Sequence, residues 1–245
     1  MYFRGLEFRF RWVPTLVLAF LVPLFVALGI WQLGRAEQKR ELAHLSSERA
    51  NMPAWELSGQ KASPELLRYR RLRATGIFES EGQFFIENRH EGNRIGFHVI
   101  TPLHIRGSDM RVLVNRGWVP AARDGSPTAA PVPDGQVTVT GRSNIPSPPA
   151  LILGGEADPA KQWGKRWPYL TVELFAVGAD YPVQPVVILE EPRDPYGFLR
   201  NWPPELPKEG MHIGYAIQWF AFAFIAVAIW LRLGLVRRTE GGIRA

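Results

Sequence analysis

The residue with the clearest chemical potential is His212, which stands one position before a long apolar stretch. A titratable side chain beside a membrane-length segment is costly unless it has a partner or a task. On a helix, His212 shares a face with Tyr215, Ala216 and Trp219. An imidazole above a small residue and beside flat aromatic rings could ligate the iron of a planar macrocycle held between helices. The alternative is that His212 only marks a membrane interface, with Tyr215 and Trp219 as interfacial belt residues.

Two charge-free stretches are long enough to position such a site. Residues 12–34 contain no charge over 23 positions, and residues 213–231 contain none over 19 positions. As helices they would be about 35 Å and about 28 Å long. Both lengths suit a hydrocarbon core of roughly 30 Å. The sequence therefore predicts a membrane protein with a transmembrane helix near each end, the two forming a hairpin.

An antiparallel hairpin would bring the end of the first helix to the same membrane depth as His212. Trp31, Gln32 and Arg35 occupy that end. The guanidinium of Arg35 could then pair with a carboxylate of a bound macrocycle.

The first apolar stretch has two further features. Ala19, Pro23 and Ala27 share one face, which predicts that another helix packs closely there. A cleaved signal peptide is a competing interpretation, because residues 27–29 are a weak cleavage-like site. The apolar stretch is longer than the usual signal core and is followed at once by basic residues, which favours an uncleaved anchor.

The charge pattern predicts how the chain is organised. The net charge is +6, yet residues 34–212 hold 22 Lys or Arg and 21 Asp or Glu, so the excess lies at the two ends. Positive charge beside apolar helices fits anionic lipid headgroups better than nucleic acid. The expected parts are a cytoplasmic N-terminus (1–11), a first span (12–34), a periplasmic β-rich domain (35–212), a second span (213–231) and a cytoplasmic tail (232–245).

The central region is predicted to be a mainly antiparallel β domain of the α+β type. Residues 71–78 alternate, with Leu72, Ala74, Gly76 and Phe78 on one face. Turn signals at residues 81–82 and 107–109 favour antiparallel neighbours. Residues 37–50 should extend the first helix as a stalk, and residues 170–177 should form a short helix. Further strands are predicted at residues 83–88, 96–105, 111–119, 136–142 and 183–191.

The sequence offers little support for an enzyme. It contains no phosphate-binding glycine loop, no nucleophile elbow and no paired-histidine zinc motif. The absence of Cys excludes thiolate metal sites and disulfides. His90, His98 and His104 lie on or near predicted strands, where two could meet as ligands or where all three could be structural. Catalytic groups assembled from distant positions remain an alternative.

Several segments, in this order, resemble the Surfeit locus protein 1 family over essentially the whole chain. They are Gly29-Ile30-Trp31-Gln32-Leu33-Gly34-Arg35 with Lys39, Tyr69-Arg70-Arg71-Leu72 leading to Gly76-Ile77-Phe78, Val112-Leu113-Val114-Asn115-Arg116-Gly117-Trp118-Val119-Pro120, Val139-Thr140-Gly141, and His212-Ile213-Gly214-Tyr215-Ala216-Ile217-Gln218-Trp219-Phe220.

The resemblance implies an assembly factor for haem-copper cytochrome c oxidase and not a catalyst. It implies that haem a is bound or handed over while the catalytic subunit matures. His212 matches the family's motif histidine, which implies an axial-ligand role, and Tyr215 and Trp219 match the positions beside it. We expect Arg35 near the propionates and Trp31 among the aromatic side chains against the macrocycle.

The resemblance also sets the expected partners and location. They are the oxidase catalytic subunit, haem a synthase as a possible supplier, and the lipid bilayer, with no nucleic acid. The lack of an Arg- and Ser-rich transit peptide before the first span suggests a bacterial inner-membrane protein.

One departure from the family pattern and two alternative functions stay open. Gly210-Met211 stands where many relatives have an Asn-Asn pair, and Met211 is itself a possible soft ligand. A second reading is a protein–protein chaperone for an oxidase subunit that binds no haem. A third is a membrane-anchored envelope enzyme, which requires a pocket of converging polar groups in the β domain.

Overall fold

The computed structural model describes residues 6–150, 165–191, 198–202 and 209–237 of the chain. It divides into two compact units. The helical unit comprises Met1–His44 and Leu206–Ala245, and the sheet unit comprises Leu45–Glu205.

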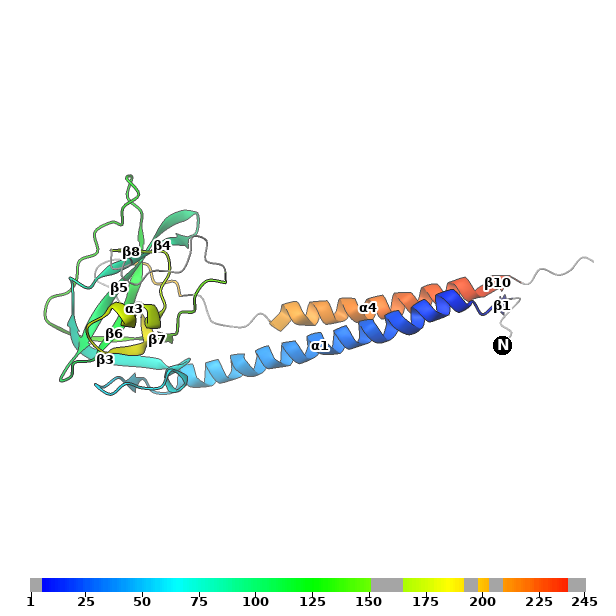
Figure 1. Ribbon diagram of the computed structural model, residues 1–245, viewed down its shortest axis with the longest axis horizontal. Helices are drawn as coiled ribbons and strands as arrows, with labels where there is room; N and C mark the ends of the chain where they lie inside the picture. Colours follow the sequence, from blue (N-terminus) through cyan, green and yellow to red (C-terminus); the bar gives the residue numbers. More distant parts are fainter. Residues whose placement is uncertain (1–5, 151–164, 192–197, 203–208, 238–245) are drawn as a thin grey trace, which may run out of the picture. The chain divides into compact units, whose positions relative to one another are not determined.

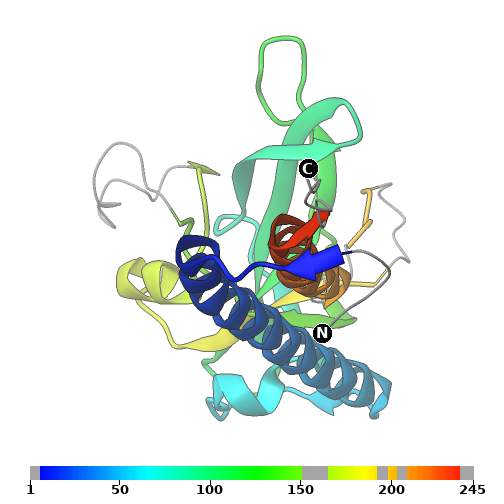
Figure 2. The same ribbon diagram turned by 90° about the vertical axis from the view of Figure 1, so that its right-hand side faces the viewer.

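The helical unit is an antiparallel pair of long helices. Helix α1 (Trp12–Asn51) has 40 residues and helix α4 (Glu209–Gly234) has 26, and the two run side by side (Figures 1 and 2). Strands β1 (Leu6–Phe8) and β10 (Leu235–Arg237) pair antiparallel beyond the helix ends. The continuous α1 confirms that residues 37–50 extend the first apolar stretch as a helical stalk.

Contacts along the hairpin fix the register of the two helices. The indole of Trp230 donates a hydrogen bond to Oγ1 of Thr15 (2.9 Å), and the rings of Phe25 and Trp219 stack at 5.8 Å. A Cβ added at Gly29 would lie 2.6 Å from the ring of Phe220. Gly29 therefore provides the close approach between the helices.

The predicted packing face of the first helix was wrong. Ala19, Pro23 and Ala27 are exposed, whereas Phe25 and Gly29 lie against α4. Small residues permit close approach of two helices. Here Trp219 of α4 stacks on Phe25, and Phe220 of α4 lies over Gly29, so the face of α1 that carries Phe25 and Gly29 makes the contact.

The outer surface of the helical unit is strongly apolar. Both helices are long and apolar enough, by length and composition, to cross a membrane. Trp12, Phe20 and Phe224 are 74%, 68% and 75% exposed. In water, such a surface would be far larger than the apolar patches that monomeric proteins tolerate.

The sheet unit contains an eight-stranded sheet in the order β2-β3-β7-β9-β6-β5-β4-β8. Two short helices accompany it: α2 (Pro64–Leu67) and α3 (Val172–Gly178) (Figure 1). The strands are β2 (Trp55–Glu56), β3 (Arg71–Phe78), β4 (Phe84–Glu91), β5 (Arg94–Ile105), β6 (Arg111–Pro120), β7 (Gln136–Asn144), β8 (Arg166–Trp167) and β9 (Val183–Glu190). All six predicted strands and the helix predicted at residues 170–177 are present within a few residues.

Strand pairing makes the sheet mixed and partly closed. Strand β3 pairs with both β7 and β5, so β3, β7, β9, β6 and β5 form a closed ring. The pairs β2–β3, β4–β8 and β6–β9 are parallel. The pairs β3–β5, β3–β7, β4–β5, β5–β6 and β7–β9 are antiparallel, so the described sheet is mainly antiparallel, as predicted, and the parallel pairs are what the prediction did not include. Strand β9 follows a long connection that carries α3, and such a crossover permits parallel pairing.

Of the two predicted turns, one joins paired strands and the other does not. Residues 107–109 join the antiparallel strands β5 and β6. Residues 81–82 lie between β3 and β4, which are not neighbours in the sheet. A turn signal marks where the chain reverses, but it does not say which strands then pair.

The alternation of apolar residues places cores on both faces of the sheet. One cluster includes Leu72, Ala74, Leu103, Val112 and Ile188, from the five ring strands and their loops. A second cluster lies on the opposite face, where Ile100, Leu113 and Val187 pack with residues of α3.

A β-bulge in β6 explains the glycine of the 112–120 motif. Val99 pairs with Gly117 and Ile100 with Asn115, so Arg116 is the extra residue of the bulge. Gly117 has a φ of 133°, and a Cβ there would lie 2.8 Å from Cβ of Phe198. A bulge and a close approach to residue 198 thus both account for a glycine at this position.

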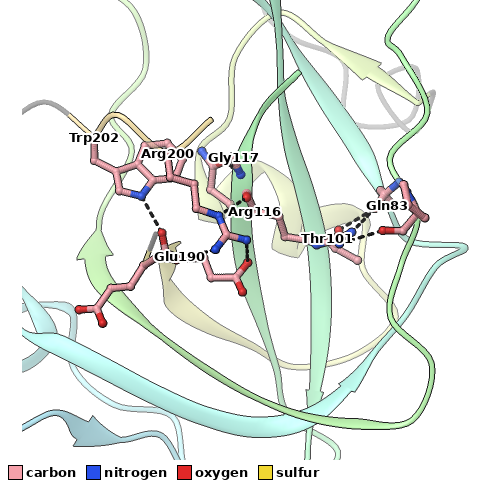
Figure 3. Close-up of polar contacts among 10 residues, drawn as sticks. Gln83, Thr101, Arg116, Gly117, Glu190, Arg200 and Trp202 are labelled. Carbon is pink, nitrogen blue, oxygen red and sulfur yellow. Dashed lines mark hydrogen bonds and ion pairs between the residues drawn. The ribbon is translucent and has the colours of Figure 1, made fainter. Parts of the chain in front are cut away.

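A buried polar network holds residues 198–202 against this bulge (Figure 3). Arg200 donates to the carbonyl of Arg116 (2.7 Å) and forms an ion pair with Glu190 (2.9 Å). Arg116 donates to Oε1 of Gln83 (3.1 Å), and the indole of Trp202 donates to the carbonyl of Glu190 (2.8 Å). Because a buried guanidinium is costly without partners, these bonds fix the path of the segment over the sheet.

Candidate functional site

The candidate site lies where α4 begins, beside the part of α1 that follows Gly29. Nδ1 of His212 is 2.8 Å from Oε1 of Gln32. This bond joins residues 180 positions apart in sequence. It places Gln32 at the depth of His212, as the antiparallel hairpin predicts.

The hydrogen bond selects one tautomer of His212. The Oε1 atom of Gln32 can only accept, so Nδ1 of His212 must carry the proton. Nε2 then keeps its lone pair and can bind a metal. A histidine oriented through its second nitrogen is the usual arrangement of a metal ligand.

The aromatic residues next to His212 do not share one environment. Tyr215, one turn along α4, is 46% exposed. Trp219 stacks on Phe25 within the hairpin, with an angle of 27° between the rings. The structure thus places Tyr215 at the surface and Trp219 in the helix–helix contact, although a helical wheel puts both on the face of His212.

Arg35 and Trp31 form a second surface group on α1. The guanidinium of Arg35 lies 5.9 Å from the ring centroid of Trp31 and donates a hydrogen bond to Oε1 of Gln38 (3.0 Å). Trp31 is 55% exposed. Arg35 is therefore a solvent-accessible cation that can exchange its bond to Gln38 for a carboxylate.

The helix contact next to His212 leaves no space for a planar ligand between the helices. Ala216, one turn along α4, is 1% exposed, and Gly29 lies against Phe220. A macrocycle bound to His212 must therefore lie on the outside of the hairpin, where Trp31 and Tyr215 are exposed. Met211, which precedes His212 in the chain, is 52% exposed.

The three histidines of the sheet do not form a metal site. Within the described ranges no group of three or more His, Cys, Asp or Glu side chains could hold a metal ion. Nε2 of His104 lies 2.6 Å from the carbonyl of Ser108, and His90 is exposed. His98 is half-buried, and burial followed by the charge of Arg89 lowers its pKa to about 4.

The lowered pKa of His98 predicts a pH-dependent stability. The folded protein keeps His98 neutral down to about pH 4, whereas the unfolded chain protonates it below about pH 6.5. Stability should therefore fall as the pH drops from 6.5 towards 4, with no effect above 6.5. When the pH is lowered from 7 to 5, the unfolding free energy of the parent should fall by more than that of His98→Gln, and the difference between the two falls should be about 1–2 kcal/mol.

Urea unfolding at the two pH values measures this difference. His90→Gln, which removes an exposed histidine from the same sheet, controls for the loss of a histidine as such. Equal pH slopes for the parent and His98→Gln would show that His98 is not held neutral.

Two residues of functional interest were not identified as site residues from the sequence. Gln32 was placed near His212 but given no role, although an amide within an apolar span is itself a signal for a buried hydrogen bond. Arg89 gave no signal, because its position depends on a local irregularity in β4.

Comparison with known proteins identifies the family. The SURF1 family model matches residues 19–224. A SURF1-like protein of Monosiga brevicollis is 26% identical over 238 residues, covering 89% of this chain and 86% of that protein. A SURF1-like protein of Caenorhabditis elegans is 26% identical over 253 residues (90% and 74%). Surfeit locus protein 1 of Arabidopsis thaliana is 27% identical over 209 residues (79% and 52%). Because the family model matches the sheet unit and most of both long helices, the chain belongs to the SURF1 family.

Proposed function

We propose that the chain is a membrane-anchored assembly factor for haem-copper cytochrome c oxidase, which holds haem a through His212 and passes it to the maturing catalytic subunit. The observation that carries this proposal is the hydrogen bond from Nδ1 of His212 to Gln32, which in the neutral imidazole leaves Nε2 with a lone pair at the end of the hairpin where α4 begins. Family membership supports the assembly role.

The side chains around His212 suit an amphipathic macrocycle with carboxylates. Nε2 of His212 would ligate the iron, and Trp31 and Tyr215, which are both exposed, would offer aromatic surface to the macrocycle. Arg35 is close enough to Trp31 to place its charge at the edge of the same surface. Trp219 would support the site from within the hairpin by its stacking on Phe25.

A surface site is also suited to transfer. A ligand on the outside of a hairpin can be reached by another membrane protein without unfolding of the carrier. Binding should be of modest affinity, so that the oxidase subunit can take the haem. The supplier would be a membrane enzyme that makes haem a, and the acceptor would be the oxidase catalytic subunit.

Membrane insertion of both helices is part of the proposal. Both helices expose many large apolar side chains, and the length of each helix suits a bilayer. Both chain ends would then be cytoplasmic, with the sheet unit on the periplasmic side of a bacterial inner membrane.

The absence of Cys from the chain permits a clean topology test. Asn93→Cys, in the exposed turn after β4, should react with a membrane-impermeant maleimide in intact spheroplasts. Thr239→Cys, in the predicted cytoplasmic tail, should react only after lysis. The reverse labelling pattern would contradict the proposed orientation, and labelling of both positions in spheroplasts would contradict insertion.

Complementation tests the assembly role. A bacterium that makes haem a and lacks its own SURF1-family gene should produce catalytic subunit with little haem a. The parent chain should restore the haem a content of the purified oxidase, and His212→Ala should restore much less at equal protein level.

The same experiment separates the haem proposal from a purely protein–protein chaperone. Full restoration by His212→Ala would favour a chaperone that contacts the subunit and binds no haem. Failure of the parent itself in a host that expresses it as a folded membrane protein would contradict the assembly role.

A further inference from the structure

The sheet unit contains a cavity of about 420 Å³ that the hairpin residues do not line. Strands β4, β5, β6 and β9 contribute one wall, on the face that also carries the second core cluster. Its volume lies within the range of small-molecule sites. The wall is mainly apolar, with Ile100, Val187 and Leu189 among the lining residues.

A β-bulge brings a cation into this cavity. Ile86 pairs with His98 and Arg89 with Gly96, so β4 has one residue more than β5 between these pairs. Asn88, inside the irregularity, has a φ of 54°. In an unbroken strand, side chains at 86 and 89 would point to opposite faces of the sheet. The bulge puts both of them on the cavity wall.

The guanidinium of Arg89 has no ion-pair partner among the described residues. Its Nε atom is buried and has no hydrogen-bond partner there. The described residues that line the cavity include no Asp or Glu. Burial lowers the pKa of Arg89, but a guanidinium remains protonated in proteins. A partly buried charge without a partner is unfavourable, and an anion in the cavity would provide that partner.

The remaining polar groups can complete a binding site. His98 lies beside Arg89 as a neutral ring and makes a T-shaped contact with Trp202 at 5.5 Å. Trp202 is fixed by its hydrogen bond to the carbonyl of Glu190 (Figure 3). The amide of Asn144 and the phenol of Tyr169 also line the cavity and can donate hydrogen bonds.

We propose that this cavity binds a small organic anion with an apolar body and one carboxylate. The carboxylate pairs with the guanidinium of Arg89, and the apolar body lies against Ile100, Val187 and Leu189. The planar fork of a guanidinium matches a carboxylate. A single cation in an apolar wall favours one negative charge over a strongly hydrated multivalent anion. The site lies wholly within the sheet unit and is independent of the proposed haem site.

The third alternative from the sequence, an envelope enzyme, requires a pocket of converging polar groups in the sheet unit, and such a cavity exists. Its described lining supplies a cation, an imidazole and amides beside an apolar wall. The proposal concerns ligand binding alone.

Calorimetry on the full-length protein in detergent tests the proposal with two matched probes. Naphthalene-1-carboxylate carries the apolar body and the charge, and naphthalene-1-carboxamide carries the body alone. The parent should bind the carboxylate at least tenfold more tightly than the carboxamide. Arg89→Gln should lose about ten- to a hundredfold in carboxylate affinity and leave carboxamide affinity unchanged.

Two further variants distinguish the site from general effects. Arg73→Gln removes an exposed charge on β3 and should bind both probes like the parent. Asn144→Phe, which fills the cavity without removing Arg89, should weaken both probes, and it keeps the test decisive if Arg89→Gln does not fold. Equal binding of the two probes by the parent, no binding of either, or an equal loss from Arg73→Gln and Arg89→Gln would overturn the proposal.

Discussion

His212→Ala is expected to abolish most haem a retention by the purified protein while leaving the sheet unit folded. The side chain supplies an imidazole at the start of α4, and the hydrogen bond to Gln32 orients it. In the proposed site His212 is the axial ligand, so its removal would take away the bond that holds the macrocycle on the hairpin. At equal protein concentration, the haem absorbance should fall at least tenfold.

Two neighbouring substitutions sharpen this result. Gln32→Leu removes the hydrogen bond to Nδ1 but keeps the ligand, so haem affinity should fall by about ten- to a hundredfold. Met211→Leu should retain haem, because the account gives the sulfur no role. Retention of haem by His212→Ala with an unchanged spectrum, or its loss from Met211→Leu, would contradict the assignment of His212.

Gly117→Ala is expected to cause the largest loss of stability in the sheet unit. Gly117 has a φ of 133°, which side chains rarely adopt, and a Cβ would lie 2.8 Å from Phe198 and 3.0 Å from the carbonyl of Leu199. Strain and displacement of the 198–202 segment should together cost about 2–4 kcal/mol. Urea unfolding monitored by tryptophan fluorescence measures the change, since Trp118 and Trp202 lie at this segment.

Gly125→Ala is the matched control for the cost of placing a side chain on a residue with a positive φ. Gly125 also has a positive φ (77°), but no atom lies within 4 Å of a Cβ placed there. Its substitution should cost about 1 kcal/mol. If Gly117→Ala were no more destabilising than Gly125→Ala, the close contact with residues 198–202 would not contribute to stability.

Local sequence patterns predicted most of the elements. Alternation located Arg71–Phe78 at the bounds found for β3, because one face of that strand is buried and the other is exposed. The charge-free stretches located both long helices. Residues 37–50 were predicted to continue the first helix, and they do.

Features that depend on pairs of distant residues were predicted less well. The parallel pairing of β6 with β9 depends on a crossover that no local pattern encodes. The choice of Gly29 over Ala19 and Ala27 as the close-approach residue depends on where the aromatic rings of α4 fall. In the candidate site, the residue types were predictable. The exposure of Tyr215, the packing of Trp219 against the other helix and the hydrogen bond of His212 to Gln32 were not, because they depend on the register of the two helices.

The position of Arg89 in the cavity wall could not be predicted from the local sequence pattern either. A strict two-residue period places Arg89 and Ile86 on opposite faces of β4, and only the irregularity at Asn88 reverses this. Asn tolerates a positive φ better than most residues, but an Asn within a strand is too weak a signal to predict a bulge from one sequence.

The most direct test of the central claim is the visible spectrum and pyridine haemochrome assay of the parent protein. The protein is purified in mild detergent from a host that makes haem a. Haem a, together with a spectrum that changes in His212→Ala, is the predicted result. A colourless parent with a folded sheet unit would contradict haem binding and would leave protein contacts as the only route to a role in oxidase assembly.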